Sequence, residues 1–453
     1  MGITNFCTLI NKTIEPDQEP PKEPEYFDSI LYDVQSLLHV AISEALETNE
    51  PKLFRELCES AWKTFQKHLN IFLSYAAADR ITLILCFDGI GVPMKWPTQR
   101  ERRSKKDGIV RSVQIQGKSK YRSALFGPNI IALEVQKFFV TRLKKFRFQN
   151  IQELVVIISG CNVPGEGEHK LFHIAEKMQS DPSSVSCRNP LIVSQDQDVF
   201  IIALMRLSRY ETLQIFRYGN YYPVTKLFRE WLSYPIYHLE VCSFLFGNDF
   251  IPTLVGITPN NACAINQCLE LQEHSSSAAS SCCSDDTLSE EEESLLSTHP
   301  VSIIACFIER MSKNLRFQKL AHLDGSLVES FWIVFFWLKD YYTQSEFPQK
   351  YIENPIYDAF DRNQLLTALT SPQFSFRCYE RARIAYQTMR RDPVSMEEAE
   401  KAVFMEEDVV KILKPYWVAP NDKACVVLKI KNQSPPSCLV KFPKSTSTGI
   451  GRW

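Results

Sequence analysis

Acidic side chains at the ends of short apolar runs, or at the openings of predicted helices, are the residues best suited to chemistry in this chain. Mg²⁺ and Mn²⁺ prefer carboxylate oxygens as ligands and retain several water molecules. Two such cations about 4 Å apart can activate water, hold a scissile phosphate and stabilise the leaving oxygen. The pattern therefore predicts a catalytic two-cation site made by seven acids: Asp33, Asp88, Glu166, Glu168, Asp196, Asp198 and Asp249.

The sharpest local signal is GCNVPGEGEH, at residues 160–169. Pro164 can preset the start of a helix, and the two glycines allow the backbone to approach a ligand closely. Glu166 and Glu168 then fall in the first turn of the predicted helix. Because the helix dipole stabilises acids there without any cation, plain helix-start acids remain the alternative.

Each of the other acids also has an ordinary explanation when it is taken alone. Asp33 and Asp88 could each cap a turn or a helix. Asp196 and Asp198 stand just after an apolar run, where acids often cap a turn. Asp249 lies among aromatic residues in FGNDFIP, so its carboxylate needs a partner, for which a cation is one candidate. The predicted site therefore depends on all of these acids meeting in space.

The elements that must position these acids alternate between apolar runs and helical patterns through the first half of the chain. This alternation predicts an α/β fold with a mostly parallel, twisted central sheet and helices on both faces. Ligands of such sheets bind beyond the carboxyl ends of the strands, which is where the acids follow. The predicted strands are residues 30–32, 81–87, 154–158 and 191–193, with a helix at 130–145.

The second half has a different organisation. The Ser-rich acidic stretch that begins it is too poor in apolar residues to pack, so we expect a disordered linker. Helices are predicted at residues 301–311, 327–342 and 396–413, and a closing pair of strands at 425–430 and 438–442. The predicted domains are 1–272, a nuclease core; 273–298, the acidic linker; 299–420, a helical region completing the core; and 421–453, a small β tail.

The distribution of charge favours a polyanionic partner. The whole chain carries −2, but seven acids and no basic residue lie within residues 273–293, so the remainder carries +5. Ten Lys or Arg residues lie between Lys95 and Arg122. A basic stretch of this kind is typical of proteins that contact nucleic acid.

The composition is that of an ordinary globular protein, with 45% hydrophobic and 23% charged residues. The 14 cysteines show no repeated CxxC spacing, which predicts reduced thiols. We expect no membrane contact, because no run of about 18 uncharged apolar residues occurs. The opening MGITNFCTLI has no basic region before an apolar run, so no secretory signal is expected. These features predict an intracellular protein, with the cytoplasm slightly favoured over the nucleus.

Seven motifs resemble, in order, those of the Xrn family of 5′→3′ exoribonucleases within the flap-endonuclease-like, PIN-like superfamily. They occupy residues 1–258 and read MGITNF, LYDVQSLLH, FDGIGVP, KWPTQRERR, SGCNVPGEGEHKLF, SQDQDVFIIAL and FLFGNDFIPTL. GEGEHK and GNDF are the most specific. Gln197 replaces the alanine of the family's Asp-Ala-Asp, which keeps both carboxylates. The chain resembles a short form of the family, and a viral origin stays open.

The resemblance implies that the substrate is single-stranded RNA with a 5′-monophosphate. It also implies that this RNA is hydrolysed to mononucleotides. It also implies two Mg²⁺ or Mn²⁺ ions held by the seven acids. The 5′-phosphate pocket of the family falls on Lys95, Gln99, Arg102 and Arg103, whose spacing places them along one helical face. A solvated helix face is the alternative. His39 matches the base-stacking histidine of the family, and a hydrogen-bonded structural histidine is equally open.

Two other functions stay open. GITPNNA, at residues 256–262, resembles a flap-endonuclease turn that grips duplex DNA, so a structure-specific DNA nuclease is the second interpretation. An inactive RNA-binding scaffold is the third, although an unused acidic cluster would cost stability. The Trp- and Tyr-rich segment of the family is poorly matched, and only FWIVFFWLKDYY, at residues 331–342, resembles its start. For Trp332 and Trp337 we therefore expect packing in the core.

Overall fold

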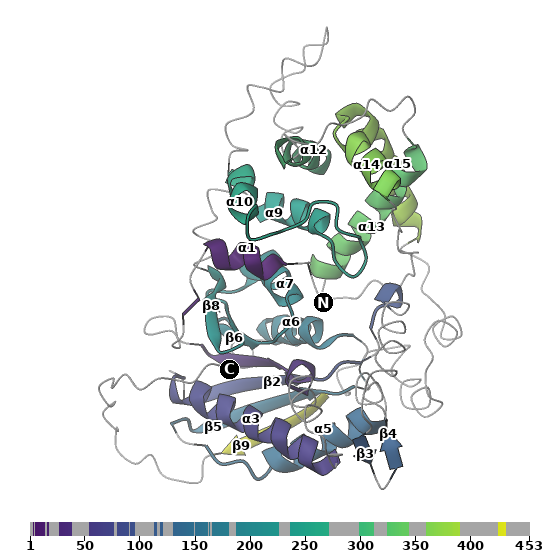
Figure 1. Ribbon diagram of the computed structural model, residues 1–453. Coiled ribbons are helices and arrows are strands. Elements are labelled where there is room, and N and C mark those ends of the chain that lie inside the picture. The colour runs from purple at the N-terminus through teal and green to yellow at the C-terminus, as the bar shows by residue number, and fades with distance from the viewer. Residues whose placement is uncertain are drawn as a thin grey trace.

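A seven-stranded sheet forms the centre of the computed structural model (Figure 1). Five neighbouring strands are parallel and the two edge strands are antiparallel to them, which confirms the predicted, mostly parallel sheet. In spatial order the strands are β8 (Asn220–Pro223), β7 (Gln214–Arg217), β6 (Pro190–Val193), β1 (Ser29–Asp33), β2 (Arg80–Cys86), β5 (Glu153–Ser159) and β9 (Cys425–Lys431). A separate antiparallel hairpin pairs β3 (Val113–Ile115) with β4 (Lys118–Lys120).

The structure describes helices and strands of the chain and some of the segments that connect them. The described residues are 3, 5–13, 16–17, 27–38, 54–76, 79–89, 91–95, 113–115, 118–120, 130–148, 150–161, 163, 165–180, 187–225, 236–270, 299–311, 324–343, 359–389 and 425–431.

The inner strands form because they are short apolar runs that helices cover on both sides. All five residues of β1 are buried, as are the last six residues of both β2 and β5. A strand buried on both faces reads as a near-continuous apolar run, which is why these strands could be predicted. In the register of the sheet, Asp33 pairs with Cys86, and Cys86 pairs with Ser159. The carboxyl ends of these strands therefore meet at one edge of the sheet.

Helices cover both faces of the sheet (Figure 1). One face is covered by α3 (Phe54–Ser74) and α5 (Ile130–Leu143), the other by α6 (Gly167–Gln179) and α7 (Asp198–Arg206). On α3, Leu57, Ala61 and Phe65 recur at the four-residue spacing of one helix face and are buried against the sheet. The predicted helix at 130–145 is confirmed and ends at Leu143.

A layer of further helices lies beyond α6 and α7 (Figure 1). These are α1 (Phe6–Thr13), α9 (Ile236–Ser243), α10 (Ala262–Glu270), α12 (Pro300–Met311), α13 (Gly325–Thr343), α14 (Ala359–Leu369) and α15 (Pro372–Met389). The predicted helices at 301–311 and 327–342 are confirmed as α12 and α13. Trp332 and Trp337 of α13 are fully buried, as the prediction of core packing required. The predicted helix at 396–413 and the acidic linker lie outside the described residues.

The strand predicted at 425–430 is confirmed as β9, which pairs antiparallel with β5 at the edge of the central sheet. Its main-chain groups complete the hydrogen bonding of β5, so part of the predicted tail belongs to the same sheet as the first half of the chain. The predicted partner strand at 438–442 lies outside the described residues. The domain boundaries remain predictions. Among the described helices, none combines the length and apolar character needed to cross a membrane.

Candidate active site

All seven predicted acids lie around the carboxyl edge of the sheet. Asp33 ends β1 and Asp88 follows β2. Asp196 lies in the loop between β6 and α7, and Asp198 is the first residue of α7. The remaining three come from the start of α6 and from the turn that follows α9. The seven are Asp33, Asp88, Glu166, Glu168, Asp196, Asp198 and Asp249. The structure thus brings together residues far apart in sequence, and their role as cation ligands remains a prediction.

The first turn of α6 passes close to two of these acids. The N–H of Gly167 donates a hydrogen bond to Asp88 Oδ1 across 2.7 Å. A Cβ at position 167 would lie 2.7 Å from Asp33 Oδ1 and 3.3 Å from Asp88 Oδ1. Only glycine leaves room for this approach, which is the role predicted for a glycine in this motif. Gly165 adopts φ +105° just before the helix, a conformation that glycine adopts without strain.

A chain of hydrogen bonds joins Asp33 to the loop after β6. Ser194 Oγ donates to Asp33 Oδ2 across 2.9 Å, and the N–H of Asp196 donates to Ser194 Oγ across 3.1 Å. The N–H of Asp198 in turn donates to Asp196 Oδ1 across 3.1 Å. The N–H of Ile3 donates to Asp198 Oδ1 across 2.9 Å. These bonds fix the orientation of three carboxylates before any ligand binds.

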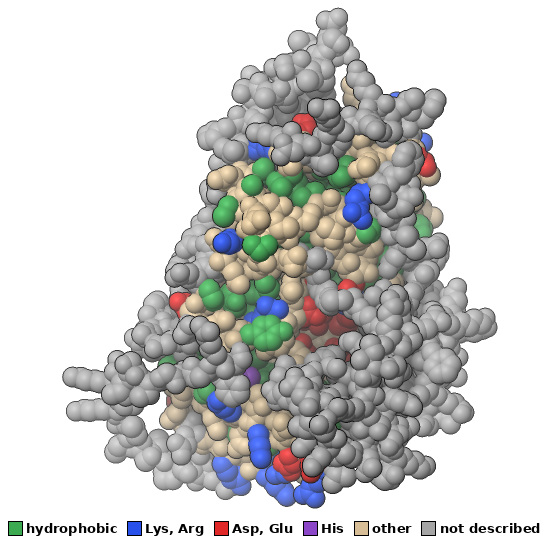
Figure 2. All heavy atoms as spheres, in the orientation of Figure 1, with side chains coloured by type: hydrophobic (Ala, Val, Ile, Leu, Met, Phe, Trp, Pro, Cys, Tyr) green, Lys and Arg blue, Asp and Glu red, His purple; other side chains and the backbone are tan. Residues whose placement is uncertain are grey.

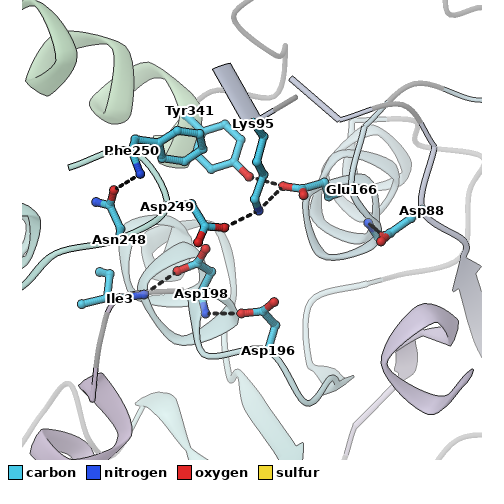
Figure 3. Close-up of polar contacts among 11 residues, drawn as sticks. Ile3, Asp88, Lys95, Glu166, Asp196, Asp198, Asn248, Asp249, Phe250 and Tyr341 are labelled. Carbon is cyan, nitrogen blue, oxygen red and sulfur yellow. Dashed lines mark hydrogen bonds and ion pairs between the residues drawn. The ribbon is translucent and has the colours of Figure 1, made fainter. Parts of the chain in front are cut away.

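Lys95, at the end of the short 3₁₀ helix η1 (Pro93–Lys95), lies inside the acidic cluster (Figure 3). Its Nζ lies 2.8 Å from Glu166 Oε2 and 3.2 Å from Asp249 Oδ2, and its side chain is 5% exposed. Burial disfavours the charge of Lys95. Nevertheless, the negative charges of Glu166, Asp249, Glu168 and Asp198 hold the pKa of Lys95 well above its usual value. The ammonium therefore neutralises part of the cluster.

Lys95 was predicted to belong to the 5′-phosphate pocket, and the structure places it among the acids. Its role toward a phosphate stays a prediction. The other predicted pocket residues, Gln99, Arg102 and Arg103, lie outside the described residues. His39, the predicted base-stacking residue, also lies outside them.

The carboxylates raise one another's proton affinity because they are buried together. Burial, and then the charge of Asp88, raises the pKa of Asp33 to about 8. Burial, and then Glu166, raises the pKa of Asp88 to about 6. Burial, and then Asp196, raises the pKa of Asp198 to about 7. Like charges held close in a low dielectric repel strongly, and a divalent cation would relieve that repulsion.

The donor atoms at this edge fit a hard divalent cation. Ligand atoms of Glu166, Glu168 and His169 lie within 4.8 Å of one another. Further carboxylate oxygens surround them. A set of ligand atoms made mostly of carboxylate oxygens suits Mg²⁺ or Mn²⁺ better than a metal that prefers thiolates. The imidazole of His169 packs against the ring of Tyr341 with a centroid distance of 4.1 Å.

Two residues outside the predicted set, Tyr341 and Lys170, also hold this site. Tyr341 of α13 donates a hydrogen bond through its hydroxyl to Glu166 Oε2, the oxygen that also accepts from Lys95. Lys170 donates through Nζ to the carbonyls of Gly160 and Val163, at 2.9 and 3.2 Å, and so closes the loop before α6. The only signal for Tyr341 was its place in an aromatic segment that resembles the family.

Known proteins share the part of the chain that carries most of this site. Residues 1–218 match the family described as the XRN 5′-3′ exonuclease N-terminus. The 5′-3′ exoribonuclease 1 of Schizosaccharomyces pombe is 22% identical over 311 residues, which cover 57% of this chain and 23% of the relative. The human 5′-3′ exoribonuclease 1 is 22% identical over 304 residues, covering 56% of this chain and 17% of that protein. The matches thus span less than a quarter of either relative.

Among solved structures, the catalytic core of Rad2 in complex with a DNA substrate aligns with 86% of this chain and 100% of its own, at 13% identity. The TM-score of this alignment is 0.37. The family match is independent of that likeness and includes every acid of the cluster except Asp249. Residues 1–218, just under half of this chain, are therefore similar to the XRN 5′-3′ exonuclease family.

Proposed function

We propose that this chain is a 5′→3′ exoribonuclease that hydrolyses single-stranded RNA with a 5′-monophosphate to mononucleotides. The observation that carries the proposal is the convergence of seven acids at the sheet edge, within and beside a region similar to the XRN family. Divalent cations would relieve the repulsion among these buried acids, and phosphodiester hydrolysis is a reaction that such a cation site can catalyse.

The seven acids would hold two Mg²⁺ or Mn²⁺ ions. When bound, these ions would neutralise charge on the scissile phosphate and lower the pKa of a water molecule. Other residues of the chain hold these carboxylates in fixed orientations through hydrogen bonds. Gly167 orients Asp88 through its N–H, and Ser194 orients Asp33 through its hydroxyl. Tyr341 fixes one oxygen of Glu166, so the donor atoms need little rearrangement to receive cations.

Selection of a 5′-phosphate is the finer part of the proposal. Lys95 is a cation already beside the acids, within reach of an anionic group bound there. Gln99, Arg102 and Arg103 follow it in a basic stretch and would complete a socket for a terminal phosphate. His39 would stack on the first base. A small socket of this kind accommodates a monophosphate better than a triphosphate.

A direct assay tests the proposal. End-labelled single-stranded RNA, single-stranded DNA and a DNA flap are incubated with the full chain and Mg²⁺ or Mn²⁺, each with 5′-monophosphate, hydroxyl or triphosphate ends. We expect labelled mononucleotide to be released first and fastest from monophosphorylated RNA, with no release by Asp198→Asn. Cleavage at the flap junction would instead support the DNA nuclease. Absence of product with either metal would support the inactive scaffold.

A further inference from the structure

The hairpin that joins β7 to β8 carries an unusual turn. Arg217 pairs with Asn220, so Tyr218 and Gly219 are the two turn residues. Their φ angles are +47° and +83°, and a two-residue turn with both φ angles positive is of type I′. Asn, Asp or Gly normally occupies its first position, because a bulky side chain is strained there. The fold alone does not explain an aromatic residue at this position.

Tyr218 is also open to solvent. It is 54% exposed, more than any other aromatic residue that the structure describes. The guanidinium of Arg217 lies over its ring, with the carbon centre 4.6 Å from the ring centroid. A strained backbone that presents an exposed ring beside a cation is a feature that binding sites often have.

The turn is hydrogen-bonded to the loop that carries Asp196 and precedes Asp198. The N–H of Tyr218 donates to Gln195 Oε1, and Arg217 Nε donates to the carbonyl of Gln195, both across 3.0 Å. Gln195 immediately precedes Asp196. Arg217 Nη1 also lies 3.1 Å from Cys7 Sγ. The pKa of that thiol is raised mainly by burial and responds to both Arg217 and Asp196, so both charges lie near it.

Figure 2 shows acidic side chains in a hollow on this face of the molecule, with a hydrophobic side chain and basic side chains beside them. A nucleic acid whose phosphate entered the hollow would pass over such a rim. Aromatic rings and guanidinium planes stack on any nucleobase, because every base has a π face.

We propose that Arg217 and Tyr218 form a stacking platform for one nucleobase of single-stranded nucleic acid bound across the acidic cluster. This proposal rests on the proposed nuclease function and adds a base contact to it. Contact with a π face does not depend on sequence, which suits an enzyme that must accept any base at each step. Gln195 holds the platform in register with Asp196, so the stacked nucleotide has a fixed distance from the site.

Replacing Tyr218 by Asn separates stacking from turn formation. Asparagine favours the first position of a type I′ turn, so Tyr218→Asn removes the ring and relieves the backbone strain. We expect its thermal unfolding midpoint to equal or exceed that of the wild type. We also expect its dissociation constant for a 5′-phosphorylated RNA decamer, with Ca²⁺ in place of Mg²⁺, to rise about tenfold.

Two further variants control this experiment. Tyr218→Trp keeps an aromatic face and should bind the RNA within about twofold of the wild type. Tyr75→Asn removes another partly exposed tyrosine, directly after α3, and should leave affinity unchanged. Unchanged affinity in Tyr218→Asn would overturn the platform, as would absence of RNA binding by the wild type.

Abasic substitutions along the decamer locate the stacked base. At one position, loss of the base should weaken the wild type about tenfold and leave Tyr218→Asn unaffected. Equal losses in both proteins at every position would contradict the platform. The hydrolysis assay distinguishes the two proposals. If the wild type degrades the RNA and Tyr218→Asn binds RNA normally, only the stacking platform is refuted. If the wild type binds RNA but never degrades it, the nuclease function is refuted.

Discussion

The N–H of Gly167 and Asp88 Oδ1 are joined by a hydrogen bond of 2.7 Å at the first residue of α6. The same glycine lies against Asp33, because a Cβ there would stand 2.7 Å from Asp33 Oδ1. Carboxylates from two neighbouring strands are thus packed against the backbone of a third element. Small displacements of that backbone should therefore change the geometry of the whole site.

Gly167→Ala should disturb the site without unfolding the protein. The added methyl group must push both carboxylates aside, and a misplacement of about 1 Å can cost about a hundredfold in rate. We expect RNA hydrolysis to fall by about that factor, with weaker Mn²⁺ binding in calorimetry. Gly256→Ala is the matched control, because its Cβ would meet only Thr253 Cγ2, at 3.8 Å. Equal activity of the two variants would contradict this account of Gly167.

Tyr341→Phe tests whether α13 contributes to the site. The change removes the hydroxyl that donates to Glu166 and keeps the buried ring. Because a hydrogen bond to a charged group contributes about 1.5–3 kcal/mol, we expect hydrolysis to fall at least about tenfold. Mn²⁺ affinity, measured by calorimetry, should fall as well.

Tyr342→Phe is the control for Tyr341→Phe. It removes a neighbouring buried hydroxyl for which the described residues provide no hydrogen-bond partner. Its activity and Mn²⁺ affinity should match those of the wild type. If both tyrosine variants behaved alike, packing rather than the hydrogen bond to Glu166 would explain the effect.

Lys95→Met should change stability and cation affinity in opposite directions. Without the ammonium, Glu166 and Asp249 lose a buried cationic partner, so stability in EDTA should fall by about 3–5 kcal/mol. Mn²⁺ no longer competes with Lys95 for these oxygens and should bind more tightly. Denaturant unfolding with and without Mn²⁺ measures both effects, and weaker Mn²⁺ binding in the variant would refute the competition.

Lys137→Met is the control for Lys95→Met. Lys137 forms an exposed ion pair with Glu134 on α5, and pairs of this kind contribute only about 0–1 kcal/mol. Neither stability in EDTA nor Mn²⁺ affinity should change measurably.

His68 predicts a pH dependence of stability. It shares a hydrogen bond of 2.8 Å with Tyr32 Oη, and burial, followed by the charge of Lys67, lowers the pKa of His68 to about 4. His68 therefore takes up a proton near pH 6.5 in the unfolded chain but only near pH 4 in the folded chain. The contribution of His68 to stability is complete above pH 6.5 and is lost as the pH falls toward 4.

Comparison of the wild type with His68→Gln isolates this contribution. Glutamine does not titrate, so the free energy of unfolding in EDTA should fall less steeply in the variant between pH 6.5 and 4. The difference between the two curves should reach roughly 2–3 kcal/mol. Parallel curves would show that His68 is protonated as easily in the folded protein as in the unfolded chain.

The sheet and the acids at its edge could be predicted because both depend on local patterns. Strands β1, β2, β5 and β6 are built on the buried apolar runs 30–32, 81–87, 154–158 and 191–193, and a polar residue follows each run. The parallel arrangement then places the following acids at one edge. The pairing of β9 with β5 could not be predicted, because an apolar pattern shows that a strand exists but not which strand it joins.

The surroundings of the acids could not be predicted in the same way. Lys95 begins a basic stretch whose spacing suggested a face turned to a phosphate, and only the folded chain places it between Glu166 and Asp249. Tyr341 lies 175 positions from Glu166 in the sequence, so no local pattern connects them. No sequence pattern marks Tyr218 as a binding residue, because that role is inferred from its positive φ angle and from its hydrogen bond to Gln195.

Calorimetry of Mn²⁺ binding by the full chain, after treatment with EDTA, measures whether the converging acids hold cations. We expect two bound ions per chain at neutral pH and a loss of at least one of them in Asp198→Asn. Absence of binding at millimolar Mn²⁺, or binding that Asp198→Asn leaves unchanged, would contradict the claim that the converging acids form a cation site.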